Sequence, residues 1–336
     1  MKRWIPALIA LAITPLFAVG VFLSMPTHFQ VVNSIKLEDY AMVAVGQKKA
    51  WFCDGGKLYN LELSHSINAP QAIDQLEAPN YTHCVAIDAD RLFLSRRGLI
   101  QVYQIRDVQK PEFVSSFRPP GNSPSIFALR SGLLAMDGYG GGTDSQKIHV
   151  YDVSNIAQPT LLSTVVTARG AHIHNIAMTD LLILVANGWD GLTIIGKDDD
   201  QEYAIVGKIK LAGYVRGAFA EGNRAYVASS TAPGLKSEFA IVDISDSASP
   251  KRIASVETSG GAQDVYVHEQ VAFVADRGGG LLAVDISDEM QPVIIDRYSR
   301  TGTLFTNISG SSDLLVLTRA VGNHDETLEV LTFNKP

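Results

Sequence analysis

The sequence has few cysteines and no block of basic residues. Cys53 and Cys84 are the only thiols among 336 residues, and Lys plus Arg number 28 against 35 Asp plus Glu, which gives a net charge of -7. A protein that binds nucleic acid usually needs a cluster of Lys and Arg to neutralise phosphates. The composition therefore argues against a nucleic-acid partner, while a hydrophobic content of 46% argues against disorder.

The chain also lacks motifs that mark several common active sites. Residues 137–144 are rich in glycine, but no Gly-Lys-Ser/Thr follows, as a phosphate-binding loop requires. The same segment lacks the alternating oxygen ligands of an EF-hand loop, and the acidic residues 198–200 are expected in a solvated turn. No G-x-S-x-G sequence lies between a strand and a helix, which argues against a nucleophile elbow.

Residues 4–23 form an uncharged, largely apolar run directly after Lys2 and Arg3. About twenty apolar residues can cross a hydrocarbon layer as a helix, and the positive charges keep their end inside. We therefore expect residues 1–28 to be a signal peptide or an N-terminal membrane anchor. The remainder would then lie outside the cytoplasm, in the periplasm or at the cell surface. The weak small-x-small sequence at residues 18–20 leaves both cleavage and retention open.

A twelve-residue pattern recurs along the rest of the chain. It is clearest as FAIVDISDSASP from Phe239 and LLAVDISDEMQP from Leu281, and the other copies begin at residues 58, 100, 148, 192 and 328. The seven starts are 42 to 48 residues apart, a spacing typical of propeller blades or helical arrays. Most copies are rich in Val, Ile, Leu and Tyr and then run into Ser, Asp or Asn and usually Pro, as a strand entering a turn does.

Three further strand-like segments lie between successive copies, most clearly residues 262–267, 271–275 and 292–298. Apolar residues at helical spacing over long windows are missing. The sequence therefore predicts an all-β fold, a seven-bladed β-propeller of four-stranded blades that spans residues 29–336. Because the last copy ends at Pro336, the seventh blade lacks an outer strand, and residues 29–37 are expected to supply it and close the ring.

Two positions of the repeat have a structural interpretation. Asp152, Asp243 and Asp285 each precede a polar turn, where a short carboxylate can accept backbone N–H bonds. The proline after the turn is expected where the outermost strand begins, because a missing N–H removes no ladder bond at an edge. These recurring features are therefore expected to stabilise hairpins and not to form a ring of reactive carboxylates.

The V-D-I-S-D sequence at residues 242–246 and the A-D-R-G-G-G-L sequence at residues 275–281 resemble the LVIVD-repeat proteins, exported bacterial β-propellers. The resemblance extends over about residues 29–336 and is closest in the fifth and sixth copies. In the fourth copy, residues 196–200 replace the usual Asp-x-Ser. The resemblance implies a propeller fold and an extracytoplasmic location, and it carries no shared catalytic residue.

His83, His172 and His174 are the candidate metal ligands. His172 and His174 are two residues apart at the start of an inner strand and so point to the same side, and His83 has a similar place two blades earlier. That place is the mouth of the central channel, where neutral imidazoles can bind a divalent metal. Because no third ligand has a recognisable spacing, the expected role is that of polar residues in a water-filled channel, and metal binding is the alternative.

Polar loops of uneven length are expected on one face of the propeller, around the channel mouth. They join the second strand of a blade to the third, or the outer strand to the next blade, and binding residues concentrate on such loops. The candidate binding residues on this face are Tyr139, Trp189, Tyr214, Arg216, Asp264, Arg277, Arg319 and His324. They combine aromatic anchors with charges, as recognition surfaces do.

The sequence favours an exported, non-catalytic propeller scaffold that needs no cofactor and binds a protein or polysaccharide partner through this face. The alternative is a periplasmic metal-dependent hydrolase or lyase with its site at the channel mouth. A third ligand within reach of both His172 and His174 would separate the two hypotheses. Cys53 and Cys84 are expected on neighbouring blades, as either a disulfide or two buried thiols.

Overall fold

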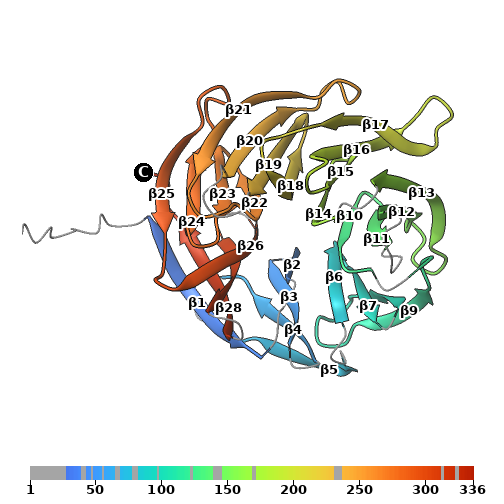
Figure 1. Cartoon of the computed structure of the whole chain (residues 1–336). Helices are drawn as coiled ribbons and strands as arrows, with labels where there is room; N and C mark the ends of the chain where they lie inside the picture. The colour runs from blue at the N-terminus through green and yellow to red at the C-terminus, as the bar shows by residue number, and fades with distance from the viewer. Residues whose placement is uncertain are drawn as a thin grey trace, which may run out of the picture.

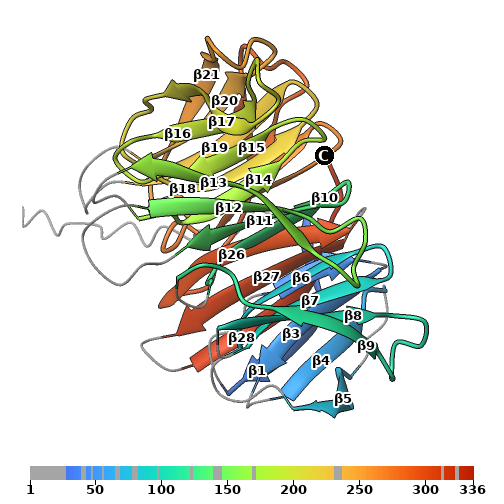
Figure 2. The same cartoon turned by 90° about the vertical axis from the view of Figure 1, so that its right-hand side faces the viewer.

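Seven four-stranded antiparallel sheets are arranged in a ring (Figure 1). Figure 2 shows the same ring from the side. The computed structural model describes residues 28–38, 43–46, 48–54, 57–64, 69–77, 82–96, 98–121, 124–138, 146–168, 172–230, 237–311, 314–321 and 325–336. These residues contain 28 strands and no helix. The first strand of each blade contacts that of the next blade, and the last blade contacts the first. The predicted all-β, seven-bladed propeller is confirmed.

The strands follow the chain in blade order, except for one at the N-terminus. Blades one to three comprise β2 (Val43–Gly46), β3 (Lys49–Asp54), β4 (Lys57–Glu62) and β5 (Gln71–Glu77); β6 (Thr82–Asp88), β7 (Arg91–Arg96), β8 (Leu99–Gln104) and β9 (Glu112–Phe117); and β10 (Phe127–Arg130), β11 (Leu133–Gly138), β12 (Gln146–Asp152) and β13 (Thr160–Ala168). Blades four and five comprise β14 (Asn175–Met178), β15 (Ile183–Ala186), β16 (Leu192–Lys197) and β17 (Tyr203–Ile209); and β18 (Tyr214–Glu221), β19 (Arg224–Ser230), β20 (Ser237–Asp243) and β21 (Lys251–Thr258). Blade six comprises β22 (Asp264–His268), β23 (Val271–Ala275), β24 (Leu281–Asp285) and β25 (Val293–Tyr298), and blade seven comprises β26 (Thr303–Ser311), β27 (Leu314–Val321), β28 (Asp325–Phe333) and β1 (Phe29–Leu37).

The inner strands are apolar on both faces because each blade packs between two neighbours. All four residues of β15 and all five of β23 are buried. One hydrophobic cluster combines blades four and five, as Leu184 and Val227 show, and the next combines blades five and six, as Ile241 and Val274 show. Burial on both faces explains why the copies read as continuous apolar runs instead of alternating apolar and polar residues.

The repeated aspartates act in the turns, as their place in the repeat predicts. Oδ1 of Asp152, Asp243 and Asp285 accepts a hydrogen bond from the backbone N–H two residues later, at 2.8, 2.9 and 2.9 Å. Hydrogen bonds from the serine of the turn are the main cause that lowers the pKa of each carboxyl. In the blades in which a proline follows the turn, the outer strand begins at the residue directly after that proline, as the sequence predicts.

The N-terminal strand β1 closes the ring. It pairs antiparallel with β28 from Phe29 opposite Phe333 to Leu37 opposite Glu326, and a bulge interrupts the register between Val31 and Asn33. The Phe29 side chain is buried against blades six and seven, with its ring centroid 4.8 Å from that of Phe333. In Figure 1 this strand, in blue, lies beside the red C-terminal strands. A strand from each end of the chain therefore completes one sheet, in which β1 covers the edge of β28 that would otherwise be unpaired.

The seven first strands surround a central channel. A cavity of about 510 Å³ in this channel is lined by residues from every blade, most of them aliphatic. His174, Asn175, Asp264, Asn307 and Thr318 supply polar groups to its wall. The expected signal peptide or anchor falls almost entirely outside the described residues. Within them, no helix is long and apolar enough to span a membrane.

Candidate functional site

The connections of the propeller divide between two faces. Those from the second to the third strand of a blade, and from an outer strand to the next blade, lie at one face, here called the loop face. Trp189, Arg277 and the residues that begin β18 and β22 belong to it. Two of the candidate binding residues, Tyr139 and His324, lie outside the described residues.

Trp189 projects from a rigid loop between β15 and β16. The N–H of Asn187 donates to the carbonyl of Gly191 at 2.9 Å, which closes the loop. Gly188 and Val215 exchange two backbone bonds of 3.2 and 3.0 Å, which tie the loop to blade five. Gly188 has a φ of +56°, and a Cβ there would meet the Tyr214 ring at 2.8 Å. This backbone holds the Trp189 indole 62% exposed at the surface.

Tyr214, the first residue of β18, is the centre of a group of four side chains, here called the Tyr214 cluster. The Trp189 ring meets it edge-on, at a centroid distance of 5.1 Å. The guanidinium of Arg216 lies 5.0 Å from the centroid of the same ring. His174 Nε2 is 2.7 Å from the tyrosine hydroxyl oxygen. The Tyr214 cluster brings together three predicted binding residues and one histidine that the sequence suggested as a metal ligand.

The charges of the Tyr214 cluster follow from its partial burial. Burial, and then the positive charge of Arg216 and the neighbouring His172, lower the pKa of His174 to about 4. Burial raises the pKa of the Tyr214 phenol. Burial, with a smaller contribution from Arg277, lowers the pKa of Arg216, which remains a cation. At neutral pH, the cluster therefore presents a neutral imidazole, a phenol, an indole and one positive charge.

Asp264 lies in the channel wall and joins three blades. Its Oδ1 accepts hydrogen bonds from the N–H of Val265 at 3.0 Å and from the Asn175 amide at 3.4 Å, and its Oδ2 accepts the N–H of Ile308 at 3.1 Å. The Asp264 side chain is partly exposed to the channel lumen, and the rest of it is buried in protein. Burial raises the pKa of Asp264 to about 7, although the backbone bonds favour its charged form.

Arg319 and Arg277 have different surroundings. Arg319 is buried, and its Nε lies 2.9 Å from Oε1 of the fully buried Glu329, which also accepts a hydrogen bond from the Tyr298 hydroxyl at 3.0 Å. Arg319 therefore belongs to an internal ion pair of blade seven. Arg277 is exposed in the loop between β23 and β24, and it has a φ of +41°, which is rare for a residue with a side chain.

The histidine pair lies at the channel mouth, where the sequence places it. The His172 and His174 ring centroids are 6.3 Å apart, His172 is exposed, and His174 lines the cavity. A metal on His174 Nε2 would compete with the Tyr214 hydroxyl. The structure describes no side chain for His83, and among the described residues no group of three His, Cys, Asp or Glu could hold a metal ion. Cys53 is a free thiol, and burial raises its pKa to about 12.

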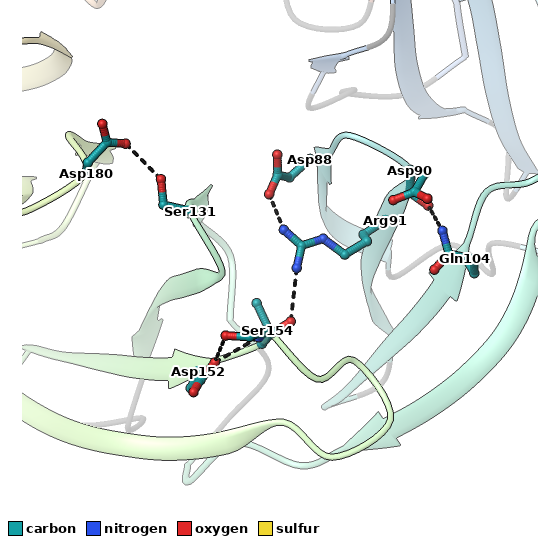
Figure 3. A network of polar contacts seen from close by, with 9 residues as sticks. Asp88, Asp90, Arg91, Gln104, Ser131, Asp152, Ser154 and Asp180 are labelled. Atoms are coloured by element: carbon teal, nitrogen blue, oxygen red, sulfur yellow. Dashed lines mark hydrogen bonds and ion pairs between the residues drawn. The ribbon is translucent and has the colours of Figure 1, made fainter.

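The opposite face carries a network of polar contacts that links blades two, three and four (Figure 3). The guanidinium of Arg91 pairs with Asp88 in its own hairpin and donates to the carbonyl of Val153 in blade three at 3.1 Å. Asp180 of blade four accepts hydrogen bonds from the Ser131 hydroxyl and from Arg130 Nε, both at 2.8 Å. These charged side chains join neighbouring blades, which gives them a structural role.

Sequence reasoning did not identify Ser230, whose hydroxyl accepts a hydrogen bond from Arg216 Nε at 2.8 Å. It ends β19, where strand pairing places it opposite Tyr214. A serine at a strand end has no distinguishing sequence signal, since only the register brings it beside the arginine.

Comparison with known proteins supports the fold and the repeat. The WD40 β-propeller domain of Doa1 superposes with a TM-score of 0.67 at 9% identity, covering 92% of this chain and 98% of that one. The Neurospora crassa Pan2 WD40 domain gives 0.64 at 10% identity, covering 93% and 98%, and the RRP9 WD40 repeats give 0.64 at 12%, covering 90% and 99%. Likenesses at such low identity show the architecture alone. No curated protein matches the sequence.

The model of the LVIVD repeat matches residues 212–258 and residues 259–300. These segments coincide with the fifth and sixth blades, in which β18 to β21 and β22 to β25 lie. They are the two copies in which the sequence resembles the family most closely. The chain is therefore a β-propeller whose fifth and sixth blades match the LVIVD repeat.

Proposed function

We propose that the protein is an exported, non-catalytic propeller scaffold that binds a protein or polysaccharide partner through the loop face. The observation that carries this proposal is the indole of Trp189, 62% exposed on a loop that two backbone bonds fasten to the next blade. A large apolar side chain held rigidly in water gains contact area on binding and loses little conformational freedom.

The Tyr214 cluster supports a recognition role. Trp, Tyr and Arg are the residue types that most often dominate binding energy when they lie side by side at an interface. Tyr214 fixes its neighbours, because the indole, the guanidinium and the imidazole all contact its ring or hydroxyl. The partner would therefore meet a preformed surface, which lowers the entropy lost on association.

Export is part of the proposal and rests on the N-terminal sequence. Lys2 and Arg3 precede an uncharged run that extends through residue 23, the arrangement of a signal peptide or membrane anchor. An alkaline phosphatase fused to the C-terminus should therefore be active. An inactive fusion on a folded protein would contradict export.

The binding proposal is tested with the partner that co-purifies with the tagged protein from the extracytoplasmic fraction. Trp189→Ala should retain less than about a tenth of that partner, because truncating a central aromatic anchor costs more than ~2 kcal/mol of binding free energy. Leu181→Ala is the matched control, since Leu181 is 81% exposed on the opposite face of the same blade. Full retention by Trp189→Ala would overturn the proposal. Loss of function together with a stoichiometric metal in His172→Ala would favour the metal-dependent alternative.

A further inference from the structure

We infer that the loop face holds an anion-binding site between blades five and six, formed by Arg216, Arg277 and Ser230, and that its ligand is a carboxylated polysaccharide. This inference rests on the proposed function, because it specifies the chemistry of the partner that the loop face would bind.

Arg216 and Arg277 both lie near Ser230. Arg216 Nε donates to Ser230 Oγ at 2.8 Å. Gly261, which follows the outer strand of blade five, lies between Ser230 and Arg277: a Cβ built on it would be 3.8 Å from the Ser230 Cβ and 3.7 Å from the Arg277 Cδ. Arg277 is also close enough to lower the pKa of Arg216 by charge repulsion. Two like charges therefore lie close together, and neither is paired with a carboxylate in the part of the chain that the structure describes.

Neither guanidinium forms an ion pair with a carboxylate of the described residues, in a chain that has 35 acidic residues. Seven other described arginines each have a carboxylate oxygen within 4.0 Å, namely Arg91, Arg106, Arg130, Arg224, Arg252, Arg300 and Arg319. An external anion would remove the repulsion between Arg216 and Arg277 and would accept hydrogen bonds from both.

The backbone at Arg277 indicates that this side chain has a role. Its φ of +41° is a left-handed conformation, which is unfavourable for a residue with a Cβ. Gly188 occupies the equivalent position of the blade-four loop with a φ of +56°. Both residues exchange two backbone bonds with the next blade. Glycine would satisfy this backbone without strain, so the arginine is held there despite a conformational penalty.

The neighbouring aromatic residues favour a sugar over an acidic peptide. Arg216 and Trp189 contact the same Tyr214 ring, so the positive charge of Arg216 lies near an exposed indole. A uronic acid presents a flat C–H face, which can stack on an aromatic ring, and a carboxylate at the edge of the same rigid ring. The protein carries a net charge of -7, so general attraction would not draw a polyanion to it. Binding should therefore depend on these two arginines.

Oligogalacturonate and its methyl ester are the probes, because they have the same rings and only the first carries charge. Isothermal calorimetry should show at least tenfold tighter binding of oligogalacturonate. Arg277→Gly should remove that difference and leave the weak binding of the ester unchanged. This substitution installs the residue of the equivalent blade-four loop, so the protein should remain folded. Arg106→Gln is the control, since it removes one exposed charge on the opposite face.

Equal binding of acid and ester would overturn the anion site and leave the aromatic binding surface standing. Binding of oligoglutamate but not oligogalacturonate would show an acidic protein partner and overturn the sugar assignment. If oligogalacturonate, its methyl ester and oligoglutamate all fail to bind, the inference is overturned. The retention of the co-purified partner by Trp189→Ala tests the proposed function independently of these ligands.

Discussion

The loop between β15 and β16 and the loop between β23 and β24 have the same backbone but different side chains. In each loop the N–H of the first residue donates to the carbonyl of the last, from Asn187 to Gly191 at 2.9 Å and from Asp276 to Gly280 at 2.8 Å. Each also forms an isolated bridge to the first strand of the next blade. The first loop presents Trp189, whereas the second presents Arg277. The repeat therefore supplies a constant frame, and single substitutions on it build the binding surface.

Alanine in place of the last glycine of either loop should have the largest effect. Gly191 and Gly280 have φ angles of +86° and +95°, and a Cβ would lie 2.2 Å and 2.5 Å from a backbone carbonyl oxygen. We expect Gly191→Ala and Gly280→Ala each to lower the free energy of unfolding by more than about 3 kcal/mol. Denaturant unfolding measures both values. A large loss for one variant only would show that the loops do not share a frame.

Gly188→Ala should lower the free energy of unfolding by about 2 kcal/mol, because the backbone is left-handed and the new Cβ would press on the Tyr214 ring. The same substitution should also reduce partner binding, since it displaces Tyr214 from Trp189. Thermal unfolding and partner retention are the measurements. Unchanged stability would mean that Tyr214 can move away freely, in contradiction to a rigid Tyr214 cluster.

Arg277→Gly gives the second loop the glycine that the first loop has at the equivalent position. It should leave the free energy of unfolding within about 1 kcal/mol of the wild-type value. Relief of left-handed strain and the greater freedom of glycine in the unfolded chain nearly offset each other. Denaturant unfolding gives this value, and Arg106→Gln is the reference for loss of one exposed positive charge. A loss well above 2 kcal/mol would assign Arg277 a structural role instead of a ligand-binding one.

His174 and Asp264, which lie beside the two loops, should give opposite pH effects. The pKa of His174 falls from 6.5 to about 4, so the unfolded chain binds the extra proton and stability rises with pH across that interval. The pKa of Asp264 rises from 3.8 to about 7, so the folded protein holds the extra proton and stability falls as pH rises through that interval.

Unfolding curves of His174→Gln and Asp264→Asn between pH 4 and pH 8 separate these effects. Relative to wild type, His174→Gln should gain stability as the pH is lowered, and Asp264→Asn should gain stability as the pH is raised. Both differences should be absent from a variant on the opposite face such as Leu181→Ala. A pH profile for either variant that runs parallel to the wild type would contradict the burial that shifts its pKa.

The candidate site could be predicted only in part. Trp189, Tyr214 and Arg216 were placed on one face by counting strands, and the structure brings them into contact. His174 joins them through the Tyr214 hydroxyl, forty residues away in sequence, which no local pattern shows. Arg319 shared the predicted face but turns inward to Glu329, because a side-chain direction depends on the neighbours that it finds.

The sequence by itself determined the number of blades, the turn that follows the third strand of a blade, and the strand that closes the ring. It could do so because these features depend on local hydrophobic patterns and turn residues, which the chain repeats at each blade. Only the tertiary structure decided which polar side chains meet. The Arg216–Ser230 contact and the approach of Arg277 require two strand registers and the packing of one blade on the next. Contacts of that kind join residues far apart in the chain, so the sequence contains no spacing from which to read them.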